Sequence, residues 1–231
     1  LLVHPRGVRH MVDPSRLWEA TCAVYGAERA YELYGMLVPV PAERIVPATD
    51  GLELQLGGRS FRVFDTPGHA RHHVCIWDAS ARAFFTGDTF GLSYRELDVD
   101  GRPFIMPTTT PTQFEPQAMH ASIDRMLAMH PQAMYLTHFS RVGDVERLGA
   151  DLHRLIDTMV AVASAARGTG VARHVEILAG LEQIVREEAT RQNWALNEEE
   201  TLELLRMDLE LNAQGLGVWL DSLRVAEAES A

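Results

Sequence analysis

The sequence predicts an α/β fold that continues into an all-helical C-terminal region. Up to residue 143, apolar runs of strand length alternate with segments whose apolar residues recur at helical spacing. Glycine and proline separate these segments, as is typical of turns between elements. From there on the strand-like runs stop, and Leu148, Leu152 and Leu155 begin a purely helical pattern. We therefore predict an α/β domain over residues 1–143 and a helical region over residues 144–231.

The N-terminal segment predicts a strand, two helices and a loop. Residues 1–4 form a short apolar piece. A helix follows, with Asp13 as its N-cap and Pro14 at its first position, and Gly26 ends it. A shorter helix over residues 28–34 leads into a loop that is rich in proline.

The middle of the chain is rich in predicted strands. A hairpin over residues 51–68 turns at Gly57 and Gly58, and its apolar residues alternate with polar ones. Further strands are predicted at 74–78, 83–88 and 133–138, and a helix at 115–129. The connection over residues 89–114 is long for a compact domain, and such connections are usually functional.

The C-terminal region predicts a series of helices. The first two cover residues 145–168 and 171–192. A third begins at a capping box, in which Asn197 is followed by Glu200. We expect Gly215 to end this helix and a last helical piece to form around Trp219.

Composition excludes several classes of function. The net charge of −11 is unsuited to coating nucleic acid, because phosphate binding relies on clustered Lys and Arg. No apolar run is long enough to span a bilayer, so we expect no membrane association. Cys22 and Cys75 are too few for a disulfide framework or a zinc knuckle. With no secretory signal visible, we expect a cytoplasmic protein that acts on a small molecule.

Three predicted strands end on side chains that bind metals well. FRVFDTPGH ends at His69, AFFTGD at Asp88 and AMYLTH at His138. Imidazole nitrogens and carboxylate oxygens are good ligands for divalent first-row ions. Each residue alone has a simpler explanation, as a turn histidine, a helix N-cap or a polar strand end. Together, at strand ends held by a rigid scaffold, they predict a metal site.

The order T-P-G-H, F-T-G-D, L-T-H resembles the later motifs of the metallo-β-lactamase superfamily, over residues 1–143. The PTTTP segment and the helical tail resemble its glyoxalase-II-like hydrolases most closely. The resemblance implies a four-layer αββα sandwich with a C-terminal helical extension. The superfamily's leading motif, His-x-His-x-Asp-His, is absent from this chain, which begins Leu-Leu-Val within an apolar run. We therefore expect the N-terminal part of the sandwich, with four further ligands, to be missing.

The resemblance also implies roles for the three metal-binding side chains. His69 would complete one metal site and His138 the other, while Asp88 would bridge two divalent ions and act as the catalytic carboxylate that orients the nucleophile. Zinc is the first expectation for both ions, with iron or manganese as alternatives. The implied reaction is attack by a metal-bound hydroxide on the carbonyl of a small thioester, ester or lactone.

Two other functions are compatible with the same motifs, because a fold does not fix an activity. The first is a mononuclear iron enzyme that oxidises persulfides, which iron analysis and oxygen consumption would identify. The second is a degenerate module that binds or assembles without catalysis. A native gene product without an upstream His-x-His-x-Asp-His would favour this second alternative.

Further residues near the motifs are candidates for supporting roles. Those that could contact substrate are Tyr94, Arg71 and Arg141, with packing or a solvated surface as the alternative. Those that could lie behind the ligands are His72, His73 and Asp65, with a histidine donating to the acid and so orienting the site. One of the two histidines could instead point to solvent.

The remaining polar residues predict less specific roles. We expect His120, His130, His153 and His174 to be surface or capping residues. We expect turns at Thr108, Thr109 and Thr110. By the resemblance, the helical region over residues 144–231 would lie over the mouth of the site and shape substrate choice. The alternative is that it forms the surface of a homodimer.

Overall fold

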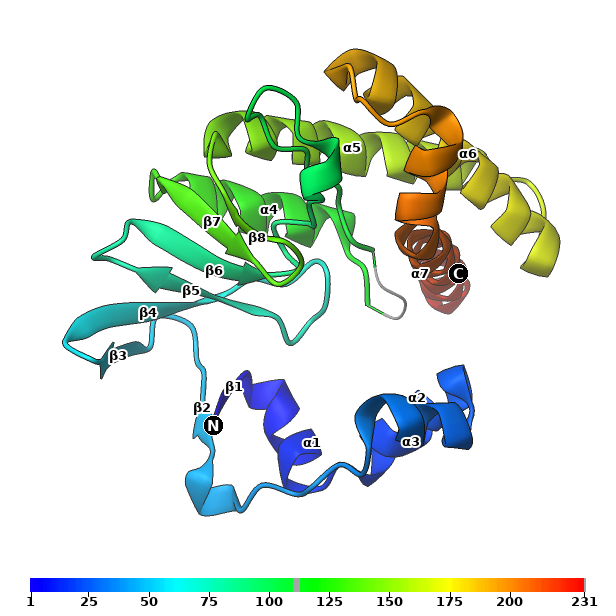
Figure 1. Ribbon diagram of the computed structural model, residues 1–231. Helices are drawn as coiled ribbons and strands as arrows, with labels where there is room; N and C mark the ends of the chain where they lie inside the picture. Colours follow the sequence, from blue (N-terminus) through cyan, green and yellow to red (C-terminus); the bar gives the residue numbers. More distant parts are fainter. Residues whose placement is uncertain (110–112, 231) are drawn as a thin grey trace.

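The computed structural model describes residues 1–109 and 113–230, and its centre is a mixed six-stranded sheet (Figure 1). The sheet order follows the chain, as β3 (Glu53–Leu56), β4 (Arg59–Asp65), β5 (Val74–Asp78), β6 (Ala83–Gly87), β7 (Ala133–Leu136) and β8 (Ser140–Val142). All neighbouring strands are antiparallel except β6 and β7, which are parallel. Parallel neighbours need a long crossover. Here the crossover contains a loop and helix α4 (Pro116–Leu127).

The hydrophobic core lies on one face of this sheet. Trp77, Phe84, Met134 and Val142 are register partners across four strands, and all four are buried. They belong to one core with buried residues of α4 and of α5 (Val145–Ala165) (Figure 1). Because side chains alternate between faces, the neighbouring row points to the opposite side. That row includes Ile76, Phe85, Tyr135 and Arg141, and it is more exposed.

The N-terminal segment is a separate set of short elements. Strand β1 (Leu2–Val3) pairs in parallel with β2 (Val46–Pro47). Three helices lie between these strands in the chain: α1 (Val8–Val12), α2 (Ser15–Tyr25) and α3 (Ala27–Tyr34). The predicted start of α2 is off by one residue, because the helix begins at Ser15 with Pro14 at the N-cap, although Asp13 Oδ1 accepts from the Ser15 backbone N–H at 3.1 Å. In the described part of the chain, β1 and β2 are the strands found outside the six-stranded sheet.

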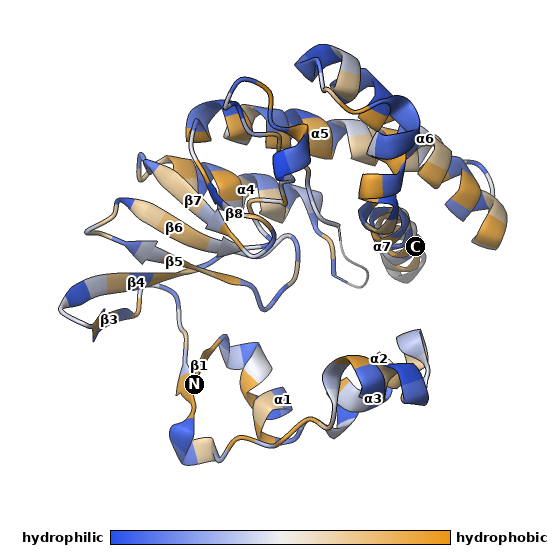
Figure 2. Cartoon of the chain, in the orientation of Figure 1, coloured by the Kyte–Doolittle hydropathy of each residue, from blue (hydrophilic) through white to orange (hydrophobic). Residues whose placement is uncertain are grey.

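Polar and apolar residues are mixed along this segment (Figure 2). Met36 and Val38 are 76% and 80% exposed.

Single turns of 3₁₀ helix occur at Pro5–Gly7, Ala42–Arg44 and Arg95–Leu97. No helix in the described ranges combines the length and the apolar character that crossing a membrane requires.

The C-terminal region consists of α5, α6 (Gly170–Gln192) and α7 (Glu198–Ser230). The predicted capping box is confirmed: Glu200 N–H donates to Asn197 Oδ1 and Asn197 N–H donates to Glu200 Oε2, both at 3.0 Å. The predicted end at Gly215 is wrong, because α7 continues through it. A Cβ at Gly215 would lie 1.5 Å from the carbonyl oxygen of Thr109. The glycine permits close approach between helix and loop.

Candidate metal centre

The structure brings the three predicted metal ligands together at one edge of the sheet. His69 Nε2 lies 3.5 Å from Asp88 Oδ2, and His138 Nε2 lies 3.6 Å from Asp88 Oδ1. Two ligands that bind one tetrahedral ion at about 2.1 Å stand about 3.4 Å apart. The carboxylate therefore faces each imidazole at the spacing of a shared ion, with one oxygen for each.

The parallel pairing of β6 and β7 explains why Asp88 and His138 meet. Parallel neighbours end at the same edge of a sheet, and both residues lie just past those ends. The Thr137 N–H donates to the carbonyl of Gly87 at 3.4 Å, which holds the two loops side by side. The parallel pairing of β6 and β7 therefore brings together Asp88 and His138, which the sequence places at the ends of two separate strands.

The main chain of Asp88 is fixed on both sides. Its N–H donates to His73 Nε2 at 3.1 Å, and its carbonyl accepts from the Thr108 hydroxyl at 3.1 Å. Its side-chain atom Oδ1 is buried and has no hydrogen-bond partner among the described residues. Burying a charged oxygen without a partner is costly, so native structures rarely do it. A cation at this point would remove that cost, and the residues present therefore fit a metal.

A glycine is needed at position 87 because His73 lies directly against its backbone. Its φ of +50° lies in the left-handed region, which favours glycine. A Cβ at this position would lie 2.3 Å from His73 Nε2. The T-G-D motif therefore places a glycine where His73 must approach the backbone to reach Asp88.

His73 is a neutral imidazole with an assigned tautomer. Burial lowers its pKa to about 3. Because Nε2 accepts from Asp88, the proton sits on Nδ1, which donates to the Thr89 hydroxyl at 2.8 Å, with Thr66 Oγ1 at 3.1 Å. Below it, burial raises the pKa of the Cys75 thiol to about 12. This polar layer supports the loop that carries Asp88.

Thr108 holds the Nδ1 side of the His69 ring, so that Nε2 lies on the side of Asp88. Its Nδ1 lies 3.1 Å from the Thr108 carbonyl, which can only accept, so the proton of a neutral ring sits on Nδ1. Thr108 Oγ1 at 2.9 Å adds a second contact to the same nitrogen. Burial is the main cause that lowers the pKa of His69. Nε2 is then the ring nitrogen with a lone pair, on the side of Asp88, and it could ligate a cation.

His138 is held less firmly than His69. Its side chain is 55% exposed, whereas that of His69 is 12% exposed. The two residues after it, Phe139 and Ser140, have φ values of +69° and +72°. Consecutive left-handed conformations are unusual for residues other than glycine. The loop that carries this ligand is therefore a strained turn between β7 and β8.

If two ions were bound, the described residues would supply two ligands to each, one imidazole and one oxygen of Asp88. Within residues 1–109 and 113–230, no group of three or more His, Cys, Asp or Glu side chains is arranged around a single point. The reason is that Asp88 offers different oxygens to the two imidazoles. The remaining coordination positions are open to water, to substrate or to ligands outside the described residues.

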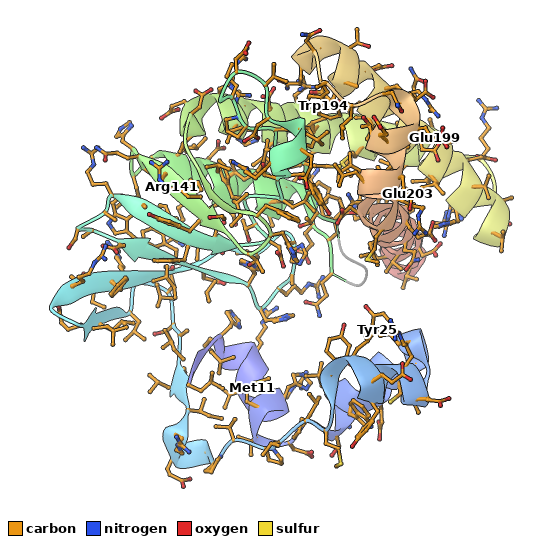
Figure 3. The ribbon with its side chains drawn as sticks, in the orientation of Figure 1. Met11, Tyr25, Arg141, Trp194, Glu199 and Glu203 are labelled. Atoms are coloured by element: carbon orange, nitrogen blue, oxygen red, sulfur yellow. The ribbon has the colours of Figure 1, made fainter. Side chains whose placement is uncertain are left out.

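The three residues predicted to contact substrate differ in whether their polar groups are already paired. Arg71 Nε donates to Glu115 Oε1 at 2.5 Å, so its charge is already paired. Arg141 is exposed on β8 (Figure 3). Tyr94 Oη donates to Asp208 Oδ2 on α7 at 2.6 Å, and its ring packs against Phe139.

The three residues predicted to lie behind the ligands have three different environments. His73 contacts the backbone of Asp88, as described above, and His72 is exposed. Asp65 Oδ1 lies 3.3 Å from His4 Nε2, which connects the N-terminal segment to the end of β4. The structure thus places His73 behind Asp88 and Asp65 beside His4.

Several residues that support the site were not singled out by the sequence as functional. Thr108 and Thr109 were predicted as turn residues, but Thr108 holds both His69 and Asp88, and Asn212 holds Thr109. Thr110 lies outside the described residues. Asp208 sits in a helix where surrounding residues give it no distinguishing signal. These contacts join segments far apart in the chain, so local patterns could not reveal them.

Comparison with known proteins identifies the family and the fold. The profile of the metallo-beta-lactamase superfamily matches residues 8–138. A metallo-beta-lactamase superfamily protein from Sulfolobus tokodaii has a similar solved structure, with a TM-score of 0.54 and 23% identity over 87% of this chain and 70% of that one. A metallo-beta-lactamase family protein from Thermus thermophilus gives a TM-score of 0.56 and 19% identity over 90% of this chain and 66% of that one. These likenesses show the fold.

Curated relatives match over shorter stretches. A metallo-beta-lactamase fold-containing protein of Sulfurisphaera tokodaii is 28% identical over 109 residues, which is 47% of this chain and 38% of that protein. A hydroxyacylglutathione hydrolase of Methylococcus capsulatus is 46% identical over 44 residues, 19% of this chain and 17% of that enzyme. The matched part therefore spans well under half the length of these relatives.

Proposed function

The chain belongs to the metallo-beta-lactamase superfamily, and we propose that it is a metal-dependent hydrolase in which His69, Asp88 and His138 hold two divalent ions. The observation that carries this proposal is the carboxylate of Asp88, which faces an imidazole nitrogen on each side at 3.5 and 3.6 Å. Its buried Oδ1, which has no hydrogen-bond partner within residues 1–109 and 113–230, supports the same interpretation. Superfamily membership supports hydrolysis, because its members are generally hydrolytic metalloenzymes.

In this proposal Asp88 is the bridging carboxylate, with His69 on one ion and His138 on the other. A divalent ion bound here would supply a nucleophile at neutral pH, because it lowers the pKa of its bound water from 15.7 to about 7. The protein's part is to hold Asp88 still. His73 and Thr108 do so by binding its N–H and its carbonyl. The nitrogen and oxygen donors suit zinc first, and iron or manganese as alternatives.

The substrate we propose is a small thioester, ester or lactone. The support is the pair of relatives named hydroxyacylglutathione hydrolase, since an acylglutathione is a thioester. The second of these, from Francisella tularensis subsp. novicida, is 52% identical over 40 residues, 17% of this chain and 16% of that enzyme. A carbonyl in the substrate is what the proposed centre would polarise.

A groove whose lining includes Arg71, two residues after His69, has room for a small substrate. It has a volume of about 760 Å³ and lies between the loop before α4 and the end of α7. Phe114 and Trp219 line it with apolar rings, and Arg71 and Glu115, which pair with one another, supply its charged groups. A second groove between α6 and α7 includes Glu199 and Glu203 (Figure 3). Its acidic lining is unsuited to an anionic substrate. We therefore propose that residues 144–231 contribute to substrate binding through the end of α7.

Metal analysis together with a substrate panel tests the proposal. We expect the full-length protein to bind two divalent ions per chain and to hydrolyse at least one thioester, ester or lactone. His69→Ala and His138→Ala should each lower the metal content. The control is His130→Asn, because His130 is exposed in a turn and asparagine tolerates its φ of +48°. One iron per chain with oxygen consumption, or no metal at all, would overturn it.

A further inference from the structure

Helix α7 is tied to the loop of His138 through one tyrosine. Tyr94 Oη donates to Asp208 Oδ2 at 2.6 Å, and the two residues are 114 positions apart in the chain. The ring of Tyr94 lies 4.3 Å, centroid to centroid, from the ring of Phe139, at an interplanar angle of 36°. Phe139 directly follows His138. A carboxylate of the helical region is thus two contacts away from a metal ligand.

His138 needs such support more than His69 does. The Nδ1 of His69 is bound to Thr108, whereas the imidazole of His138 is half exposed. The facing oxygen of Asp88 lies 3.6 Å from His138 Nε2, which is beyond a hydrogen bond. Its position therefore depends on the main chain of its loop.

That main chain is held in an unfavourable conformation. Phe139 and Ser140 both have positive φ values, as described above. Such residues persist only when the surrounding structure determines them, and they cluster at functional sites. The ring of Tyr94 against Phe139 is a contact that can determine this turn, and Asp208 in turn determines where Tyr94 lies.

The position of Asp208 on α7 suits its hydrogen bond with Tyr94. It is half buried on the inner side of α7, between the buried Leu205 and Leu209. Burial raises its pKa, while the hydrogen bond from Tyr94 and the charge of His138 act in the opposite direction.

We propose that Asp208 is a positioning residue for the metal ligand His138. It fixes the hydroxyl of Tyr94, the ring of Tyr94 fixes Phe139, and the turn at Phe139 presents the imidazole to Asp88. This inference rests on the proposed function, since it assigns a role toward the same ions. It makes α7 part of the metal centre as well as of the substrate groove.

The test compares Asp208→Ala with variants that separate its contacts. Asp208→Asn keeps an oxygen that can accept from Tyr94, and Tyr94→Phe keeps the ring but removes the donor. The control is Glu203→Gln, an exposed position on the same helix that pairs with Arg206 (Figure 3). We expect Asp208→Ala and Tyr94→Phe to weaken binding of one zinc equivalent by about 10-fold or more and to leave the other unchanged. Asp208→Asn should restore most of the affinity, and Glu203→Gln should have no effect.

A second readout needs no metal. In the metal-free protein, the NMR signal of the His138 ring should broaden or split in Asp208→Ala and Tyr94→Phe, while the His69 signal stays unchanged. If both variants fold, bind two zinc ions with parental affinities and leave the His138 signal unchanged, the inference is wrong and the proposed function stands. If the parent protein binds no zinc, the proposed function fails, and the His138 signal still decides the positioning role. Should Asp208→Ala not fold, Tyr94→Phe and Asp208→Asn carry the test.

Discussion

Two clusters in this molecule are built from the same residue types and differ in how their polar atoms are paired. At the sheet edge, Asp88 stands between His69 and His138. Between α4 and α5, the rings of His120 and His153 stack at an interplanar angle of 11°, with their Nδ1 atoms 2.5 Å apart. Each Nε2 of this second pair meets its own carboxylate, Asp157 at 3.1 Å and Asp124 at 3.0 Å.

The difference lies in whether donors and acceptors already satisfy one another. In the helix cluster each Nε2 lies within hydrogen-bond reach of a carboxylate, and the two Nδ1 atoms lie within hydrogen-bond reach of one another. At the sheet edge, the Oδ1 atom of Asp88 is buried without a hydrogen-bond partner among the described residues, with His138 Nε2 3.6 Å away. Residue composition is therefore a poor guide to a metal site, and donor arrangement is a better one.

The largest effect expected from this comparison is that of Asp88→Asn. The amide cannot bridge two cations, so we expect metal content to fall close to zero. Because metal ions supply several kcal/mol of transition-state stabilisation, hydrolysis should fall by on the order of 10³-fold. The metal-free variant should be at least as stable as the parent, since a buried charged oxygen is removed.

The matched control for Asp88→Asn is Asp124→Asn in the helix cluster, which also removes one carboxylate beside a histidine. Metal content and activity should then stay at the parental level. Two ions retained in Asp88→Asn, or ions lost from Asp124→Asn, would contradict the distinction between the two clusters.

The next largest effect is expected at His73, which the sheet-edge cluster uses as a support. His73→Ala leaves the N–H of Asp88 and the hydroxyl of Thr89 without their partner, next to a new cavity. We expect a loss of about 2–4 kcal/mol in the free energy of unfolding, measured with urea on metal-free protein. His72→Ala, one position away and exposed, should change it by less than about 0.5 kcal/mol. Equal losses in both variants would show that His73 has no special role.

A smaller effect is expected at Thr108. Thr108→Val removes the hydroxyl that bridges His69 and Asp88 but keeps the carbonyl that binds His69. Outer partners of metal ligands contribute 10- to 100-fold in affinity, so we expect about a 10-fold loss of zinc affinity by titration. Thr109→Val removes the neighbouring hydroxyl, which binds Asn212 instead, and should leave zinc affinity unchanged. An equal loss in both variants would assign the effect to loop stability.

The sequence predicted much of the fold because its signals are local. The alternation of the strands, the turn at Gly57 and Gly58 and the capping box at Asn197 each lie within a few residues, and each element is present. Strand β8 was not predicted, since three residues give no alternation. The continuation of α7 through Gly215 was not predicted either, because a glycine near a helix end usually signals its end, whereas this one is explained by its close approach to Thr109 in a distant loop.

In the candidate site, too, local patterns were predictable and long-range contacts were not. His69, Asp88 and His138 could be proposed because each ends a recognisable strand. The contacts that hold them could not be proposed, because Thr108 is 39 residues from His69 and Asp208 is 114 from Tyr94. For His73, the sequence offered Asp65 as the nearby acid. Only the positive φ at Gly87 brings the backbone of Asp88 over the imidazole.

The smallest effect is expected in the helix cluster, where removal of a histidine should alter stability and leave the metal centre untouched. We expect His120→Ala and His153→Ala each to lower the free energy of unfolding by about 1 kcal/mol, because each loses a partly exposed ion pair and a ring contact. The double variant should lose less than the sum of the single variants, with a coupling of about 0.5–1.5 kcal/mol, because both single changes break the same pair. Metal content should equal that of the parent in all three proteins. A fall in metal content would mean that the helix cluster also holds an ion, and the comparison with the sheet edge would then have to be abandoned.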